Sequence, residues 1–282
     1  MPDVYDPVLA NASNASQGGA HDRAFANGLE RLVAAADDLD DFITETQAVV
    51  ADLVETDVVA YAEMNRRTWS FRGCWPDDRS DLGALLTRYH QLMAREAIWS
   101  GSRSGMPQQF SDFMDDTALY GTAMYCEVLN PLHVNRGAFF GFGVDPGITI
   151  QFGLFRHSRQ PYPESARVTL ARLRPALARL YGLSLVRTWS RLSPADKLAA
   201  LDVPLTARQR QVAQLLTAGM TAEAIAETLG ISIETSRNHI RAVYDRLAVQ
   251  NRVQLTLALT SQPPVCLPLA DCFAVGSYAA SG

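Results

Sequence analysis

The sequence predicts a chain of two domains: an α+β domain built on an antiparallel sheet, followed by an all-α domain of four short helices. Three observations predict this fold class. The 282 residues are long enough for two domains, and 48% are apolar, so a core can be buried. Strand-like segments and a tight turn fall in the first part of the chain, whereas closely spaced helix caps fall in the last. Charge divides the same way, with 16 basic against 23 acidic residues in 1–180 (net −7) and 9 against 7 in 181–282 (net +2).

The chain begins with helical segments. Residues 1–22 are rich in Asn, Ser, Gly and Ala and are expected to form a mobile N-terminal tail. From Ala24 to about Glu55, apolar residues recur at helical spacing. The acidic cluster Asp37–Asp41 is expected to divide this stretch into two helices, because acidic residues favour the first turn of a helix. The first domain is therefore expected to start at residue 23.

Two strands and two helical stretches are expected next. Asp57–Glu63 and Thr68–Arg72 are strand-like, and the polar residues between them suit a turn. Helical spacing returns near Asp81–Ile98 and again near Asp115–Asn130.

A hairpin is predicted around Asp145-Pro146-Gly147, because proline and glycine suit the second and third places of a tight reversal. The flanking strands are expected over Ala138–Val144 and Ile148–Phe155. Alternate apolar residues share one face of this hairpin: Phe140, Phe142, Val144, Ile148, Ile150, Phe152 and Leu154. The other face carries glycines, over which a backbone or a ligand can approach closely: Gly137, Gly141, Gly143 and Gly153.

A long helix is expected from about Pro163 to Thr188, with Pro175 inside it. It carries a leucine stripe that is expected to contribute to a dimer contact: Leu170, Leu173, Leu177, Leu180 and Leu183. We hypothesise that Pro175 marks a hinge, and the alternative is a static kink that wraps the helix around the sheet. The first domain is expected to end at residue 190, and a polar linker follows over 191–204.

The first domain is dense in aromatic residues, which suggests a pocket for an unidentified small molecule. The candidate lining residues are Tyr61, Trp69, Trp99, Tyr120, Phe140, Phe142 and Phe152. The alternative for each of them is an ordinary place in the hydrophobic core.

Capping residues divide 205–262 into four helices, and an apolar, proline-broken tail follows over 263–282. The caps are Thr206 with Gln209, Thr221, Ser232, and Asn251 with Gln254, while Gly219 and Gly230 suit the turns. The second and third helices are joined by a short glycine turn, which is the arrangement of a helix-turn-helix.

The third of these helices, expected over Ile233–Leu247, has two distinct faces. Its inner face consists of Ser236, Ile240, Val243, Tyr244 and Leu247, and its outer face of Glu234, Thr235, Arg237, Asn238, Arg241 and Asp245. Arg237 and Arg241 lie one turn apart, which suits contacts with neighbouring guanines or phosphates, and Asn238 suits adenine. A solvated charged face is the alternative for the arginine pair alone, but the surrounding caps and turn favour binding to double-stranded DNA.

These residues resemble the LuxR/GerE-type helix-turn-helix transcriptional regulators. The resemblance lies in Leu205-Thr206-x-Arg208, Gly219, Ile225-Ala226, Leu229-Gly230-Ile231-Ser232, Thr235, His239, Tyr244, Leu247 and Arg252. It implies that Arg237, Asn238 and Arg241 read bases and that Ser232 and Thr235 approach phosphates. It also implies a dimer contact from the fourth helix, for which the candidates are Val253, Thr256 and Leu257. Two residues depart from the family pattern: Ser236 replaces a valine and Gln209 replaces a glutamate.

Less specifically, residues 24–190 resemble the GAF-like sensor domains that are fused to such modules, and the order of helices and strands is of the PAS/GAF kind. The similar residues are Phe110-Ser111-Asp112-Phe113, Leu119-Tyr120, Cys126-Glu127, Pro131-Leu132 and the leucine helix with Pro175. A phosphorylated receiver is set aside because the only lysine, Lys197, lies in the linker. The Trp/Tyr/Asp-Pro arrangement of acyl-homoserine-lactone sensors is not evident either.

The resemblance implies a transcriptional regulator that binds an inverted repeat as a homodimer under the control of a small molecule, with RNA polymerase as a further candidate partner. The alternative is a constitutive DNA-binding dimer whose first domain serves only assembly or protein interaction. An enzyme is not expected, because His90, His133 and His157 are accompanied by no nucleophile elbow, metal spacing or phosphate loop.

No metal or cofactor is expected, because Cys74, Cys126, Cys266 and Cys272 form no Cys-x-x-Cys pair. The sequence has no apolar run long enough for a membrane span, and its first residues do not read as a secretory signal. A cytoplasmic protein is therefore expected.

Overall fold

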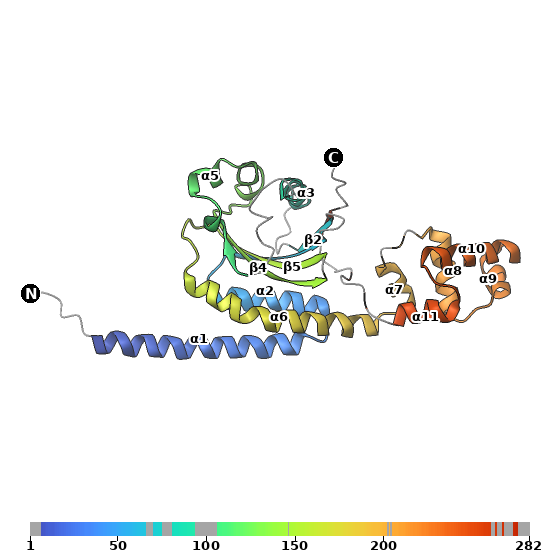
Figure 1. Ribbon diagram of the computed structural model, residues 1–282, viewed down its shortest axis with the longest axis horizontal. Helices are drawn as coiled ribbons and strands as arrows, with labels where there is room; N and C mark the ends of the chain where they lie inside the picture. The colour runs from blue at the N-terminus through green and yellow to red at the C-terminus, as the bar shows by residue number, and fades with distance from the viewer. Residues whose placement is uncertain are drawn as a thin grey trace, which may run out of the picture. The chain divides into compact units, whose positions relative to one another are not determined.

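The computed structural model describes residues 7–65, 70–74, 81–93, 106–145, 147–201, 203, 205–260, 263, 267 and 273–275. The chain divides into two compact units. The first comprises Met1–Ser184 together with Leu269–Gly282, and the second comprises Leu185–Pro268. Figure 1 colours the helices of the first unit from blue to yellow and those of the second in orange and red.

The first unit is built on an antiparallel sheet with the strand order β3-β4-β5-β1-β2-β6. The strands are β1 (Val58–Asn65), β2 (Ser70–Cys74), β3 (Gln108–Gln109), β4 (Arg136–Asp145), β5 (Ile148–Arg156) and β6 (Phe273–Val275). The predicted hairpin is confirmed as β4 and β5, and the Asp145 carboxylate accepts the Gly147 N–H at 2.9 Å in the turn. The short strands β3 and β6 were not predicted.

Helices cover both faces of this sheet (Figure 1). On one face lie α2 (Leu39–Leu53) and α6 (Glu164–Arg191), and α1 (Pro7–Ala35) packs against α2. On the other face lie α3 (Leu82–Met93), α5 (Asp116–Tyr120) and the π-helical turn η3 (Tyr125–Leu129). The predicted α+β class, an antiparallel sheet with helices, is confirmed.

The N-terminal segment differs from the mobile tail expected over 1–22, because helix α1 already begins at Pro7. Proline is well tolerated in the first turn of a helix, and the alanines that follow have high helix propensity. The predicted break at Asp37–Asp41 is confirmed, since α1 ends at Ala35 and the Asp38 side chain caps α2 by accepting the Asp40 N–H at 2.9 Å.

The apolar face of the hairpin forms the core beneath α2 and α6. Its residues Phe140, Phe142, Ile150, Phe152 and Leu154 are buried, and the ring of Phe142 lies 5.7 Å from that of Tyr181 on α6. Leu170, Leu173 and Leu177 are buried as well, whereas Leu183 is 41% exposed. The expected dimer contact is therefore wrong for these three leucines, because their side chains are already packed within their own unit.

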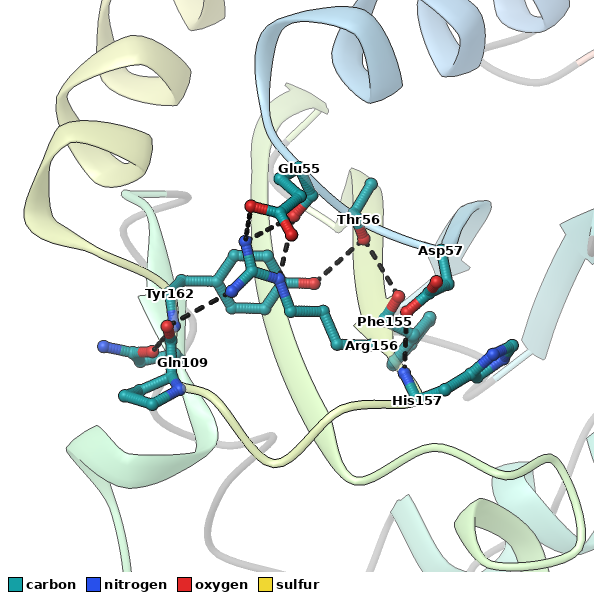
Figure 2. A network of polar contacts seen from close by, with 9 residues as sticks. Glu55, Thr56, Asp57, Gln109, Phe155, Arg156, His157 and Tyr162 are labelled. Carbon is teal, nitrogen blue, oxygen red and sulfur yellow. Dashed lines mark hydrogen bonds and ion pairs between the residues drawn. The ribbon is translucent and has the colours of Figure 1, made fainter.

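A buried arginine joins three segments at one end of the sheet (Figure 2). Nε and Nη2 of Arg156 both donate to the carbonyl oxygen of Glu55, at 2.8 and 2.5 Å, and Nη1 donates to the carbonyl oxygen of Pro161 at 3.2 Å. The guanidinium lies 4.3 Å from the centre of the Tyr162 ring, and the Tyr162 hydroxyl is 2.9 Å from that of Thr56. Arg156 thereby fixes the end of β5 to the start of β1 and to the segment before α6.

The second unit contains the end of α6 and five further helices within its described residues. They are α7 (Pro194–Ala200), α8 (Ala207–Thr217), α9 (Ala222–Leu229), α10 (Ile233–Arg246) and α11 (Arg252–Thr260). Their core consists of Leu198, Val212, Ala213, Leu216, Ile225, Val243, Leu255 and Leu259. The predicted all-helical domain is confirmed.

Most of the segment 191–201, which falls in the predicted linker, is helical. Helix α6 continues to Arg191, and α7 places Leu198 in the core of the second unit. The physical reason is local, since the Ser193 hydroxyl accepts the Asp196 N–H at 3.2 Å and Pro194 occupies the first turn.

Candidate functional site

Hydrogen-bonded caps fix the ends of the helices that carry the predicted DNA-binding surface. The Thr206 hydroxyl accepts the Gln209 N–H at 3.2 Å, and the Gln209 side chain accepts the Thr206 N–H at 2.9 Å. Helix α9 ends at Leu229 and is followed by Gly230, whose φ of +64° is rarely adopted by other residues. The Ser232 hydroxyl then begins α10 by accepting the Thr235 N–H at 3.0 Å. The capping box at α8 and the helix-turn-helix of α9 and α10 are therefore present.

Helix α10 is oriented as its sequence pattern predicts. On the inner face Ser236 and Val243 are fully buried, and Ile240, Tyr244 and Leu247 pack partly against the core. All six residues of the predicted outer face are exposed: Glu234, Thr235, Arg237, Asn238, Arg241 and Asp245. The polar side chains proposed to meet DNA are thus brought together on one surface.

Contacts between helices hold this surface in place. The Ser236 hydroxyl donates to the carbonyl oxygen of Ala222 at 2.9 Å, so the serine found in place of a valine links α10 to the start of α9. Nη2 of Arg208 donates to the carbonyl oxygen of Leu229 at 2.7 Å, which joins α8 to the end of α9. Sequence reasoning did not identify these two contacts, because each depends on how the helices pack.

The two arginines of the outer face have different surroundings. Nη2 of Arg237 lies 3.2 Å from a carboxylate oxygen of Glu223 on α9, and both side chains are more than half exposed. The side chains of Arg241 and Asn238 have no hydrogen bond or ion pair with any residue that the structure describes. Their side chains are free to make contacts with a ligand at this surface.

The predicted dimer residues share the outer face of α11. Val253 is 76% exposed, Leu257 is 62% exposed, and Thr256 beside them is exposed too. The opposite side of the helix places Leu255 and Leu259 in the core. The face of α11 defined by Val253, Thr256 and Leu257 is therefore an exposed apolar surface on a helix that is anchored from behind.

A cavity of about 50 Å³ lies against the face of the sheet opposite α2 and α6. Its lining is mainly apolar and includes Ala60, Ala62, Leu129, Phe139 and Gly153, together with Tyr89 and Gln151. Burial raises the pKa of the Tyr89 hydroxyl above its usual range. Tyr89 and Gln151 are thus neutral polar residues within a mainly apolar lining.

Most of the pocket residues predicted from the sequence are not at this cavity. Of the described ones, Tyr61 is part of the lining, and Tyr120 packs against the surrounding apolar cluster. Phe140, Phe142 and Phe152 are buried in the core on the opposite face of the sheet and do not line this cavity. The alternation of apolar residues along a strand shows which side chains share a face of the sheet. It does not show which of the two faces the long helices α2 and α6 cover. Trp69 and Trp99 lie outside the described residues.

A second hollow, of about 410 Å³, lies beside Arg156 and is also lined by His21 and Thr169. Three of its polar side chains, those of His21, Thr169 and Arg156, have partners within the protein. Nε2 of His21 lies 3.0 Å from the Thr169 hydroxyl, and the three nitrogens of Arg156 donate to backbone carbonyls. These three side chains are therefore accounted for by contacts that stabilise the fold.

Within the part of the chain that the structure describes, no cluster of three or more His, Cys, Asp or Glu residues could hold a metal ion. None of the helices in this described part is both long enough and apolar enough to cross a membrane.

Residues 203–259 match the family model described as bacterial regulatory proteins, luxR family. A putative HTH-type transcriptional regulator of Aeromonas salmonicida is 47% identical over 51 residues, which are 18% of this chain and 26% of that protein. The transcriptional regulatory protein UhpA of Salmonella typhimurium is 45% identical over 62 residues, which are 22% of this chain and 32% of UhpA. The chain thus spans only about a quarter to a third of the length of these relatives. The helix-turn-helix domain is of the luxR type.

Among solved structures, Escherichia coli SdiA is similar with a TM-score of 0.42 and 14% identity, over 79% of this chain and 90% of SdiA. The VqsR LBD domain of Pseudomonas aeruginosa is similar with a TM-score of 0.45 and 17% identity, over 57% of this chain and 96% of that domain. No ligand is assigned to the first unit from similarities at this level.

Proposed function

We propose that this chain, whose residues 203–259 form a luxR-type helix-turn-helix domain, is a sequence-specific DNA-binding transcriptional regulator. The observation that carries the proposal is the exposed face of α10 with Arg237, Asn238 and Arg241, which is held by capped helix ends and a packed core. Such a regulator works in the cytoplasm, and RNA polymerase is the further partner that an activator of this kind would need.

The proposed DNA-binding residues have two roles: some contact phosphates and position the helix, and others contact bases. Ser232 and Thr235 lie in the first turn of α10, where N–H groups and the helix dipole favour phosphate oxygens. Arg237 and Arg241 suit the O6 and N7 acceptors of guanine in the major groove, and Asn238 suits adenine. The net charge of +2 over residues 181–282 is compatible with a polyanionic partner, whereas the first 180 residues are acidic.

The protein is proposed to bind as a homodimer on an inverted repeat. One short recognition helix contacts too few base pairs to be specific alone, and two copies related by a two-fold axis read two half-sites. The outer face of α11, with Val253, Thr256 and Leu257, supplies the contact between the copies.

Substitution of the reading residues tests the function. A duplex is first enriched from random sequence by the wild-type protein, and binding to it is then titrated by fluorescence anisotropy. Arg237→Ala and Arg241→Ala are each expected to weaken binding by about 1–3 kcal/mol, because each removes a base or phosphate contact. Arg179→Ala, which removes an exposed charge from α6, is the matched control and should bind as tightly as wild type. Full affinity in both α10 variants would mean that α10 is not the reading helix.

We propose that the first unit is a GAF-like sensor, and its antiparallel sheet with helices on both faces supports this proposal. Its effector is proposed to be a small, mainly apolar molecule, because the cavity lining offers a few polar groups, such as Tyr89 and Gln151, among apolar ones. The alternative is a constitutive DNA-binding dimer with a first unit that serves only assembly. The cavity volume of about 50 Å³ favours this alternative, since ligand pockets usually measure about 300–1,000 Å³.

A comparison of DNA affinity with and without fractionated metabolite extract separates the two functions. A sensor is expected to change its affinity for the enriched duplex with at least one apolar fraction, because a ligand acts by favouring one conformation over another. Unchanged affinity and unchanged melting temperature with every fraction would leave the constitutive dimer.

A further inference from the structure

Glu223 is an acidic residue beside the surface that is proposed to bind a polyanion. It occupies the second position of α9, and its carboxylate lies 3.2 Å from Nη2 of Arg237 on the outer face of α10. The two side chains are 56% and 58% exposed, and an exposed pair of this kind contributes little to folding stability. The pair is therefore better explained by its effect on binding than by its effect on the fold.

The carboxylate is stabilised in its charged form. Its own backbone N–H and then the Thr221 hydroxyl lower the pKa of Glu223, and Arg237 lowers it further. The side chain therefore carries a negative charge at neutral pH, at the start of α9. Its contact with Nη2 of Arg237 favours the rotamers of the arginine that keep the two groups together.

Contact with Glu223 does not block Arg237 from reading a base. The contact with the carboxylate uses Nη2 alone, and a guanidinium has five N–H donors in a fork. Donors remain for a bidentate contact with guanine O6 and N7 while the carboxylate supports the group from the side. An arginine that is already oriented loses less side-chain entropy when it meets the base.

The same carboxylate opposes contacts with phosphate. The start of a helix attracts phosphate oxygens, and in a helix-turn-helix the first helix crosses the DNA backbone. In this protein a negative charge occupies the first turn of α9 and lies beside Arg237. Phosphate contacts supply essentially all non-specific affinity, so a charge of this sign weakens binding to unrelated DNA first.

We propose that Glu223 is a specificity-determining residue: it orients Arg237 toward a guanine and penalises binding to DNA that lacks this base. Glu223 thus raises the ratio of specific to non-specific affinity by weakening the non-specific binding, and it does not raise the affinity for the specific site. The inference rests on the proposed function of α10 as the reading helix. It adds a residue outside α10 to the set that determines the operator.

The test compares full-length wild type with Glu223→Gln on the enriched duplex and on a scrambled duplex of equal length, at several salt concentrations. The expected result is at least threefold tighter binding to the scrambled duplex and no gain on the enriched one, so that the specificity ratio falls at least about threefold. Glu227→Gln, which removes a charge from the same helix, is the matched control and should leave the ratio unchanged.

Glu223→Asp separates the two effects, because it keeps the charge and shortens the side chain that reaches Arg237. It is expected to keep weak binding to the scrambled duplex but to lose discrimination between guanine and other bases at the position that Arg237 reads. Both variants change an exposed side chain, and far-UV circular dichroism checks that the fold is kept.

Failure of the inference about Glu223 can be distinguished from failure of the proposed function. If Glu223→Gln leaves the ratio unchanged while Arg241→Ala loses binding to the enriched duplex, α10 reads DNA and the inference about Glu223 is wrong. If Arg237→Ala and Arg241→Ala both bind as wild type, the proposed function itself fails.

Discussion

Arg156 is a charged side chain whose role is structural. It is only 6% exposed, and its three nitrogens donate to the carbonyl oxygens of Glu55 and Pro161. Arg156→Met keeps the length of the side chain but removes the three hydrogen bonds that the buried guanidinium makes to these carbonyl oxygens. We expect the free energy of unfolding to fall by about 2–4 kcal/mol, measured by urea denaturation.

Arg159→Met is the matched control for this change. Arg159 is an exposed residue on the same segment, and its guanidinium lies 5.2 Å from the centre of the Tyr120 ring. Its replacement is expected to lower the free energy of unfolding by less than about 1 kcal/mol. Equal losses in the two variants would show that the buried hydrogen bonds of Arg156 contribute no more than a surface contact.

For two residues of α10, Ser236 and Arg237, the sequence predicted the face of the helix but not the side-chain contacts. The spacing of apolar residues placed Ser236 on the inner face of α10, and it is fully buried there. Its hydrogen bond with Ala222 was not predicted, nor was the contact between Arg237 and Glu223, which are fourteen residues apart. Both depend on the crossing of α9 and α10, which no local pattern specifies.

Elements were predicted where their signals are local. The hairpin followed from its turn residues, and the helices of the second unit followed from their caps and glycines. Strands β3 and β6 contain two and three residues, too few for a periodic pattern, and each pairs with a strand that is distant in sequence. Helix α7 was missed although Ser193 and Pro194 form a clear start signal.

Helix α6 allows a test of the hinge hypothesis at Pro175. The proline is exposed, and Leu173 and Leu177 on either side of it are buried. This packing favours the static kink, because the buried side chains hold both halves of the helix in place. Pro175→Ala is expected to raise the free energy of unfolding by about 1–3 kcal/mol, since it restores a backbone donor, and to leave DNA affinity unchanged.

Gly182→Ala is the matched control on the same helix, because a Cβ there would meet no atom within 4 Å. It is expected to stiffen α6 and to raise the free energy of unfolding by roughly 1 kcal/mol. A change in DNA affinity with Pro175→Ala but not with Gly182→Ala would support the hinge instead of the kink.

For the whole molecule, the proposed dimer can be tested at α11. Leu257→Asp introduces a charge into the exposed apolar face, and burial of an unpaired charge in an interface is unfavourable. We expect a shift from dimer to monomer in sedimentation equilibrium, together with weaker binding to the enriched duplex by at least about tenfold, because the second half-site is lost.

Ala258→Asp is the control for this prediction, since residue 258 is exposed on α11 but lies away from the face that Val253 and Leu257 share. It should remain dimeric. A wild-type footprint that covers a single asymmetric half-site at saturating protein would contradict the dimer on an inverted repeat.

The pairing of β6 with β2 makes the DNA-binding unit an insertion, because the chain passes from α6 into the second unit and later rejoins the sheet of the first. The unit is therefore tethered at both of its ends. A single proteolytic cut between α11 and β6 would not separate the fragments while the strands stay paired. Conversely, a truncated protein that ends at residue 190 would lack β6 and would expose the edge of β2. Because an exposed strand edge can pair with another chain, this fragment is expected to aggregate more than one that retains β6.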